Sequence, residues 1–230
     1  MLKKILSSKW TKAVLFLLCL IPVVRLAGPV LVAVNVLPPS AVAFPAQGWW
    51  LDLTPNPVEF ITHFTGNWTI RFLMITLTVT PLRMLLNQPQ LTRFRRMLGL
   101  FAFFYGCCHL YTWIWLSSGF DPTAMWKDVV KRWYITVGMA GLLCMVPLAI
   151  TSTAGWVRRM GYKRWQKLHR LVYFSAAAGC IHYYLLVKSD VRLPLMYAAI
   201  LTVLMLFRLK TWLKKPVKPA PRSIPQVEQA

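Results

Sequence analysis

Residues 163–188 read KRWQKLHRLVYFSAAAGCIHYYLLVK, a basic segment followed by an apolar run that contains a histidine. The apolar run approaches the length of a helix that crosses a lipid bilayer, which takes about 20 residues. Ionisable side chains are costly inside a membrane and usually have a function there. The positions of His169 and His182 in this stretch therefore bear on the fold and on the functional site.

Other parts of the chain repeat this apolar character. The chain has 230 residues, of which 57% are hydrophobic, a composition typical of membrane proteins. In lipid the backbone must satisfy its own hydrogen bonds, which favours helices. The sequence therefore predicts an all-α integral membrane protein, a bundle of six transmembrane helices at 13–36, 68–86, 97–117, 134–152, 171–187 and 193–209. We expect one domain over 13–209, after an N-terminal segment at 1–12 and before a basic, proline-rich tail at 210–230.

The basic residues predict the orientation of the bundle. Lys and Arg number 27 against six Asp and Glu, which gives a net charge of +21. With six spans, four basic segments fall on one side of the membrane: 3–12, 93–96, 158–167 and 208–222. By the positive-inside rule we expect both termini in the cytoplasm. Such a charge can also indicate nucleic-acid binding, but these residues lie between apolar runs, so we expect no nucleic-acid partner.

Two of the four histidines are predicted to lie at similar depth. His109 in the third span and His182 in the fifth each lie past the middle of a helix that runs outward. Two facing histidines at one depth are what a six-coordinate haem b requires. The alternative is a pair of histidines that form hydrogen bonds between helices, and the spacing alone favours neither interpretation.

His169 is predicted one layer lower. Thirteen residues before His182 correspond to about 20 Å of helical rise, which suits a second haem, although the two rings would then point about 140° apart. The third span has Arg96 rather than a histidine at the matching level, so a lower haem lacks an obvious second ligand. Arg96 suits a haem propionate instead. The alternative for His169 is an interfacial histidine in a basic loop.

Three more residues are candidate cofactor contacts. His63 precedes the second span, with Thr65 or Asn67 as a candidate N-cap. It is a contact near the outer haem, part of a docking face for a partner, or a loop histidine at a helix start. Arg71 and Arg25 lie inside predicted spans, where arginine is costly unless it is paired. A haem propionate or a flavin phosphate would be a natural counter-ion, whereas water or a neighbouring helix is the alternative for Arg25.

Several motifs resemble those of the MsrQ family (also called YedZ). They are HFTGNW at 63–68, TPLR at 80–83, RRMLGLFAFFYGCCHL at 95–110, and TSTAGWVRRMGYKRWQKLHRLVY at 151–173 followed by IHYY at 181–184. Members of this family are the haem-binding membrane subunits of bacterial MsrPQ methionine sulfoxide reductase systems, in the ferric-reductase-like transmembrane group. The resemblance covers about 56–208.

The resemblance implies an electron-transfer subunit of the bacterial inner membrane rather than a catalytic subunit. Electrons would come from the quinone pool or from a cytosolic flavin reductase. They would pass to MsrP, a periplasmic molybdopterin enzyme that reduces methionine sulfoxide in oxidised proteins. The implied cofactors are one or two haems b and FMN. His109 and His182 would bind the outer haem, and His169 would bind a second haem or belong to the flavin region.

Two other functions fit parts of the sequence. A stand-alone transmembrane ferric reductase would use the same haems and need no partner. A proton-coupled transporter with a histidine relay predicts a colourless protein and acids within the spans, where the predicted spans contain no Asp or Glu. No dinucleotide-binding or phosphate-loop motif occurs, so we expect no direct use of NAD(P)H.

Overall fold

The computed structural model describes residues 6–36, 38 and 56–213, and within these ranges all regular secondary structure is helical. The α-helices are α2 (Lys9–Arg25), α3 (Ala27–Ala33), α4 (Pro57–Leu85), α5 (Thr92–Thr112), α6 (Pro122–Lys131), α7 (Trp133–Ile150), α8 (Ala154–Met160), α9 (Tyr162–Leu168), α10 (Leu171–Leu186) and α11 (Arg192–Leu213). A 3₁₀ turn, Pro89–Leu91, precedes α5, and a π-helical turn, Trp113–Ser117, follows it.

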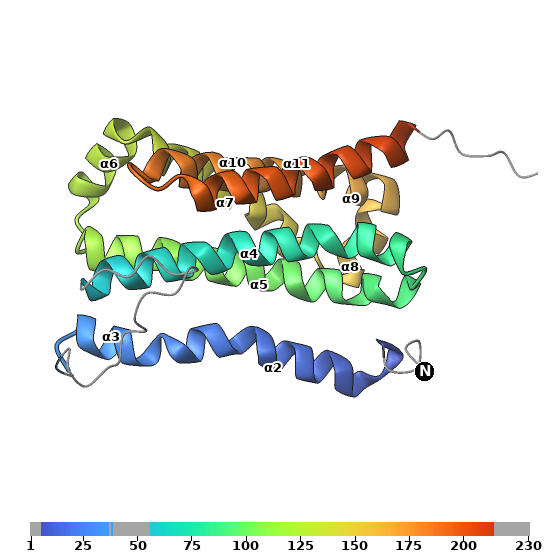
Figure 1. Cartoon of the computed structure of the whole chain (residues 1–230), viewed down its shortest axis with the longest axis horizontal. Helices are drawn as coiled ribbons and strands as arrows, with labels where there is room; N and C mark the ends of the chain where they lie inside the picture. Colours follow the sequence, from blue (N-terminus) through green and yellow to red (C-terminus); the bar gives the residue numbers. More distant parts are fainter. Residues whose placement is uncertain (1–5, 37, 39–55, 214–230) are drawn as a thin grey trace, which may run out of the picture.

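The long helices form three layers (Figure 1). The helix pair α2 and α3 forms one layer, α4 and α5 form the middle layer, and α7, α10 and α11 form the third. Within the middle layer α4 packs against α5, and within the third layer α7 packs against α10. Contacts between layers also join α5 to α7 and α4 to α10.

The outer surface of the bundle is apolar. Large side chains such as Leu17, Leu143 and Val203 are exposed, which suits contact with lipid. Among the described residues, four helical stretches are long and apolar enough to cross a membrane by length and composition: Lys9–Val32, Pro89–Ser117, Trp133–Ile150 and Arg192–Thr211. The prediction of an all-α membrane protein is confirmed. The number of six spans stays a prediction, because α10 has only 16 residues and α4 carries two arginines. The orientation of the termini also stays a prediction.

The second predicted span begins earlier than expected. Asn56 is the N-cap of α4, where its side-chain oxygen accepts a hydrogen bond from the amide of Val58 at 3.0 Å. The prediction that Thr65 or Asn67 caps this helix was wrong, since both are buried inside it. Threonine is tolerated there because its hydroxyl bonds back to a carbonyl one turn earlier, as Thr65 does to Ile61 at 2.9 Å.

The limits of two other predicted segments also differ. The first predicted span is divided at Leu26 into α2 and α3. Helix α11 continues to Leu213, past the predicted end at 209, so the tail begins later than expected. The start of the N-terminal segment at 1–5, most of the first loop at 39–55, and the tail at 214–230 lie outside the described residues.

Basic connections lie at one end of the bundle, the basic end, and connections of mixed sign, which hold the described acids, lie at the other, which we call the acidic end. Figure 1 places α8, α9 and the α4–α5 connection at one end, and α3 and α6 at the other. The four acids among the described residues belong to the α6 end: Glu59, Asp121, Asp128 and Asp190. The described parts of the segments that the positive-inside rule assigned to one side, 6–12, 93–96, 158–167 and 208–213, are thus together at one end.

A tyrosine hydroxyl attaches α2 to α5. Tyr105 is fully buried, and its hydroxyl donates to the carbonyl of Cys19 at 2.8 Å and accepts from the amide of Val23 at 3.1 Å. Pro22 lies between these two residues, where the proline ring disturbs the regular pattern of helical hydrogen bonds. The hydroxyl therefore serves two backbone groups at the weak point of α2.

A buried arginine joins α11 to α4 and α10. Pro81 lacks an N–H, so the carbonyl of Leu77, four residues earlier, has no helical donor. Arg208, only 6% exposed, donates from Nη2 to this carbonyl at 2.9 Å and from Nη1 to the hydroxyl of Tyr173. The Arg208 guanidinium thus supplies the hydrogen-bond donor that Pro81 lacks.

Replacing Arg208 by methionine should leave the Leu77 carbonyl without a donor. We expect a loss of about 1–3 kcal/mol in unfolding free energy, the usual cost of a buried polar group without a partner. Thermal unfolding in detergent, followed by circular dichroism, measures it. In a Pro81→Ala background the amide of residue 81 can serve Leu77, so the cost should fall. An equal loss of unfolding free energy in both backgrounds would contradict the coupling between Arg208 and Pro81. Arg83→Met, which changes an exposed arginine, is the control.

Candidate functional site

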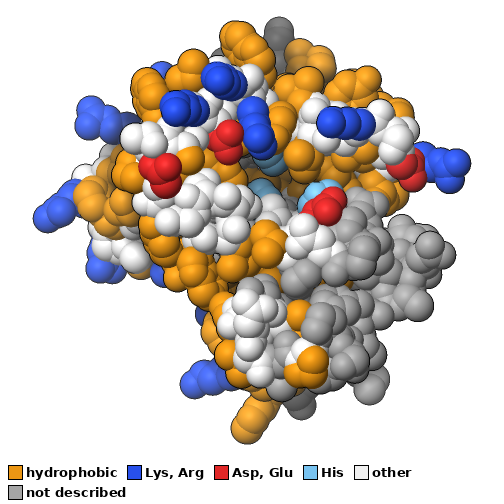
Figure 2. Space-filling view, turned by 90° about the vertical axis from the view of Figure 1, so that its left-hand side faces the viewer, with side chains coloured by type: hydrophobic (Ala, Val, Ile, Leu, Met, Phe, Trp, Pro, Cys, Tyr) orange, Lys and Arg blue, Asp and Glu red, His pale blue; other side chains and the backbone are white. Residues whose placement is uncertain are grey.

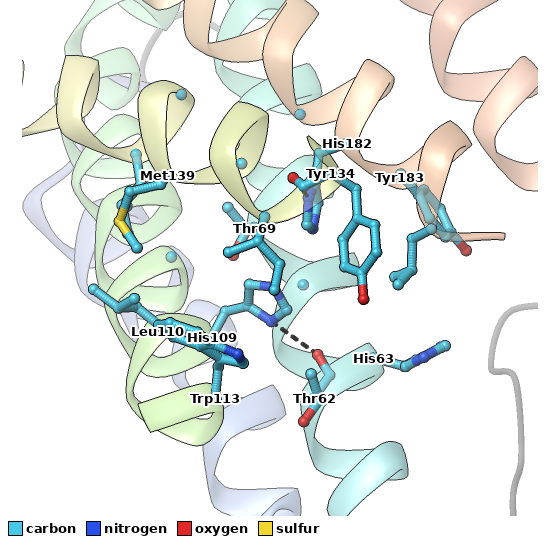
Figure 3. Close-up of a pocket in the computed structure, with 18 of the residues that line it drawn as sticks. Thr62, His63, Thr69, His109, Leu110, Trp113, Tyr134, Met139, His182 and Tyr183 are labelled. Carbon is cyan, nitrogen blue, oxygen red and sulfur yellow. Dashed lines mark hydrogen bonds between the residues drawn. The ribbon is translucent and has the colours of Figure 1, made fainter. Parts of the chain in front are cut away.

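A cavity of about 570 Å³ lies between α4, α5, α7 and α10 (Figure 3). One face of α10 lines it with residues from successive turns: Ser175, Gly179, His182 and Leu186. Helix α5 contributes His109, and α4 contributes His63. A volume of this size is typical of cofactor sites, which span about 300–1,000 Å³.

His109 is held by the backbone of α4. Its Nδ1 lies 3.0 Å from the carbonyl oxygen of Thr62, the contact dashed in Figure 3, and 3.3 Å from Oγ1 of Thr65. A carbonyl only accepts, so Nδ1 must carry the proton of this hydrogen bond. In the neutral ring, Nε2 therefore has a free lone pair.

His182 is held in the same way by the backbone of α7. Its Nδ1 lies 2.6 Å from the carbonyl oxygen of Tyr134, so this nitrogen also donates. The ring centres of His109 and His182 are 6.0 Å apart, with an angle of 75° between their planes. Histidines that bind metals usually donate their other N–H to a carbonyl or carboxylate, which fixes the tautomer and the ring orientation. Both imidazoles are thus prepared as Nε2 ligands.

The residues present fit a haem with two axial imidazoles. Imidazole nitrogens bind metal ions at about 2 Å, which suits two rings with centres this far apart. Beside the rings, a Cβ added at Gly179 would meet no atom within 4 Å, so the wall of α10 leaves open space next to His182. Leu73, Leu142 and Met145 make the inner walls apolar, as a mostly hydrophobic macrocycle requires.

The cavity opens at the acidic end of the bundle. Figure 2 shows imidazole side chains in a hollow of this end, with acidic and basic groups around it. Arg132 lines the cavity, pairs with Asp128 at 3.2 Å and donates to the Tyr134 hydroxyl at 3.2 Å. Tyr134 and Asp128 together hold the pKa of this guanidinium above its ordinary value. Glu59 and His63 also line the cavity, so its outer part is polar.

The structure places His169 away from this cavity, at the junction of α9 and α10. Its ring stacks on Trp165 with ring centres 4.0 Å apart, and Nδ1 lies 3.1 Å from the Trp165 carbonyl oxygen. Its Nε2 is buried, without a hydrogen-bond partner among the residues that the structure describes. The predicted role of His169 in a second haem or a flavin region stays a prediction.

None of the three candidate arginines lines the cavity. Arg71 donates from Nε to the Tyr197 hydroxyl at 3.2 Å, with its guanidinium 5.0 Å from the centre of the Trp68 ring. Arg96 is exposed in the first turn of α5, and Arg25 is exposed in the last turn of α2. Their predicted contacts with a propionate or a flavin phosphate stay predictions.

Sequence reasoning missed several residues of the site. In the sequence, Arg132 is one charge in a connection of mixed sign, and no motif marks it as part of a site. The sequence analysis also did not predict that glycines line the cavity. One signal was available, because Gly179 precedes His182 by three residues and so shares its helix face. Ser175, one turn further, is buried, and its Oγ has no hydrogen-bond partner in the described part of the chain.

Comparisons with known proteins identify the family of this chain. Residues 65–180 match the family described as "Ferric reductase like transmembrane component". The chain is 53% identical over 159 residues to the "Protein-methionine-sulfoxide reductase heme-binding subunit MsrQ" of Herminiimonas arsenicoxydans, covering 68% of this chain and 73% of the relative. The protein of the same name from Rhodospirillum rubrum is 54% identical over 158 residues, covering 69% and 76%.

A third relative with this name, from Caulobacter vibrioides, is 46% identical over 162 residues, covering 70% of this chain and 77% of the relative. No solved structure matches the chain. The family match covers two of the four helices around the cavity in full, α5 and α7, and most of α4 and α10. It includes His109 and Gly179 and ends two residues before His182. The chain belongs to the MsrQ family of haem-binding subunits of protein-methionine-sulfoxide reductases, within the ferric-reductase-like transmembrane group.

Proposed function

We propose that this chain binds haem b between His109 and His182 and carries electrons across the membrane for the reduction of methionine sulfoxide. One observation carries the proposal: two imidazoles with centres 6.0 Å apart face one cavity, each with Nδ1 bonded to a backbone carbonyl. The names of the relatives, which describe haem-binding subunits, support the same assignment. The haem would supply a one-electron carrier, and the protein would set its position and potential.

The chain's own residues would hold and shield this carrier. The carbonyls of Thr62 and Tyr134 fix the two rings, so that Nε2 of each points its lone pair away from the helix that holds it. The apolar walls at Leu73, Leu142 and Met145 exclude water from the inner part of the cavity. The polar mouth lies at the acidic end, where an outer partner would approach the site.

The direction of electron flow follows from the predicted orientation. If the basic end faces the cytoplasm of a bacterium, electrons enter the inner membrane there from the quinone pool or from a cytosolic flavin reductase. They leave at the cavity mouth to the periplasmic molybdopterin subunit MsrP, which repairs oxidised proteins. This route, the MsrP partner and an FMN cofactor come from the family resemblance.

A second haem would need ligands at the basic end. His169 is the candidate there, because its Nε2 is buried without a hydrogen-bond partner among the described residues. No second histidine from α5 accompanies it, since the basic turn of that helix carries Arg95 and Arg96. We therefore propose a haem between His109 and His182, and either a second haem or the flavin near His169.

A stand-alone ferric reductase is the second candidate. The family description "Ferric reductase like transmembrane component" favours it, and it would use the same histidines. The two candidates differ in the acceptor at the cavity mouth, which is a protein partner in one and a ferric chelate in the other.

The absorption spectrum tests the haem assignment. We expect the purified protein to show a sharp low-spin haem b band in the reduced-minus-oxidised spectrum, and His109→Ala or His182→Ala to abolish this band, because each removes one axial ligand. Arg83→Ala, at an exposed position outside the cavity, is the control and should keep the band. A colourless wild-type protein after expression with ample haem would overturn the proposal and leave the histidines as a polar relay.

Reoxidation kinetics test the acceptor. With the haem reduced under anaerobic conditions, we expect a catalytic amount of purified MsrP plus excess methionine sulfoxide to restore the oxidised spectrum. Methionine sulfoxide alone should leave the spectrum unchanged, and the catalytic amount of MsrP alone should oxidise only a small fraction of the haem. Rapid-mixing absorption spectroscopy measures the rate. Oxidation by a ferric chelate, with no response to MsrP and sulfoxide, would support the stand-alone reductase instead.

A further inference from the structure

We infer that Gly66 and Gly138 are positioning residues for the two haem ligands. Each glycine leaves room for a histidine ring and uncovers the carbonyl that the ring donates to. The inference rests on the proposed function, because it assigns these glycines to the haem site. Neither glycine is adjacent in sequence to the histidine that it serves.

The first example lies between α4 and α5. The carbonyl that accepts from His109 belongs to Thr62, and Gly66 follows it by four residues, one helical turn later on the same face. A Cβ built on Gly66 would lie 3.1 Å from Cε1 and 3.3 Å from Nδ1 of His109. Such contacts are tighter than most that a real Cβ makes, so the ring packs directly on the glycine backbone.

The second example, between α7 and α10, repeats the first. The carbonyl that accepts from His182 belongs to Tyr134, and Gly138 again follows it by four residues. Here a Cβ would lie 2.7 Å from Nδ1 and 3.0 Å from both Cε1 and Cγ of the ring. The ring cannot stay in place beside any other residue type, because a real Cβ essentially never comes this close to another atom.

Helical geometry explains the spacing of four. The carbonyl of residue i points toward residue i+4, whose amide is its usual helical donor. A carbonyl oxygen has a second lone pair, but a side chain at i+4 crowds the approach to it. Glycine at that position opens the approach, so an imidazole from the neighbouring helix can donate there as well. The glycine thereby selects the Nδ1–H tautomer and leaves Nε2 for the iron.

Alanine at each glycine tests the inference. We expect Gly138→Ala to weaken haem binding by about 10–100-fold, the usual effect of losing a group that orients a metal ligand. Gly66→Ala should act in the same direction but less strongly, because its contacts are longer. Haem titration of the purified variants measures the affinity, and the spin state and midpoint potential of the bound haem report ligand orientation.

Gly99→Ala is the matched control, since a Cβ there would make an ordinary contact of 3.6 Å with Thr76. It should bind haem as the wild type does, with an unchanged spectrum and potential. Thermal unfolding separates poor folding from poor ligation. If Gly138→Ala does not fold, Gly66→Ala carries the test alone.

Two results would separate this inference from the proposed function. Wild-type affinity, spin state and potential in both alanine variants, together with loss of haem in His109→Ala and His182→Ala, would overturn the positioning role and leave the haem site standing. Retention of the haem by the two histidine variants would instead overturn the haem site itself, whatever the glycine variants do.

Discussion

Backbone carbonyls that lack a helical donor, or that accept a second one, shape this structure. Inside a bilayer no water is at hand, so each carbonyl must find its donor within the protein. Pro81 leaves the carbonyl of Leu77 without an amide, and Arg208 supplies the donor from α11. Tyr105 serves the carbonyl of Cys19 beside Pro22. One contact that attaches α2 to the middle layer, and one that attaches α11, are therefore made at points where a proline interrupts a helix.

The same rule extends to the site. His109 and His182 donate to carbonyls of neighbouring helices, and these bonds orient the rings as well as pairing polar groups. In the fold, Arg208 supplies a donor to a helix carbonyl that lacks one. In the site, helix carbonyls that already have an amide donor fix the orientation of the imidazoles that donate to them. This difference explains why the site needs glycines at the point of contact, while Arg208 and Tyr105 reach their carbonyls beside prolines.

The apolar runs and the depth argument predicted much of this from the sequence, since both depend on distances along one helix. They gave the helical membrane class and similar depths for His109 and His182, whose rings lie 6.0 Å apart; their role as ligands stays a proposal. The predicted start of α4 was wrong because HFTGN at 63–67 looks like a polar helix start, whereas its threonine, Thr65, bonds to carbonyls within the helix. The involvement of Arg132 and of the two positioning glycines depends on how neighbouring helices are rotated, which a single sequence does not contain.

The two carbonyl–imidazole bonds have a consequence for the speed of electron transfer. Neither ring can turn without breaking its bond to a helix backbone, and the backbone at each point is part of a long, packed helix. Gain or loss of an electron between the rings would therefore move few atoms, because the dipoles that respond to the charge are already fixed in place. A low reorganisation energy of this kind favours rapid shuttling over tight storage of the electron.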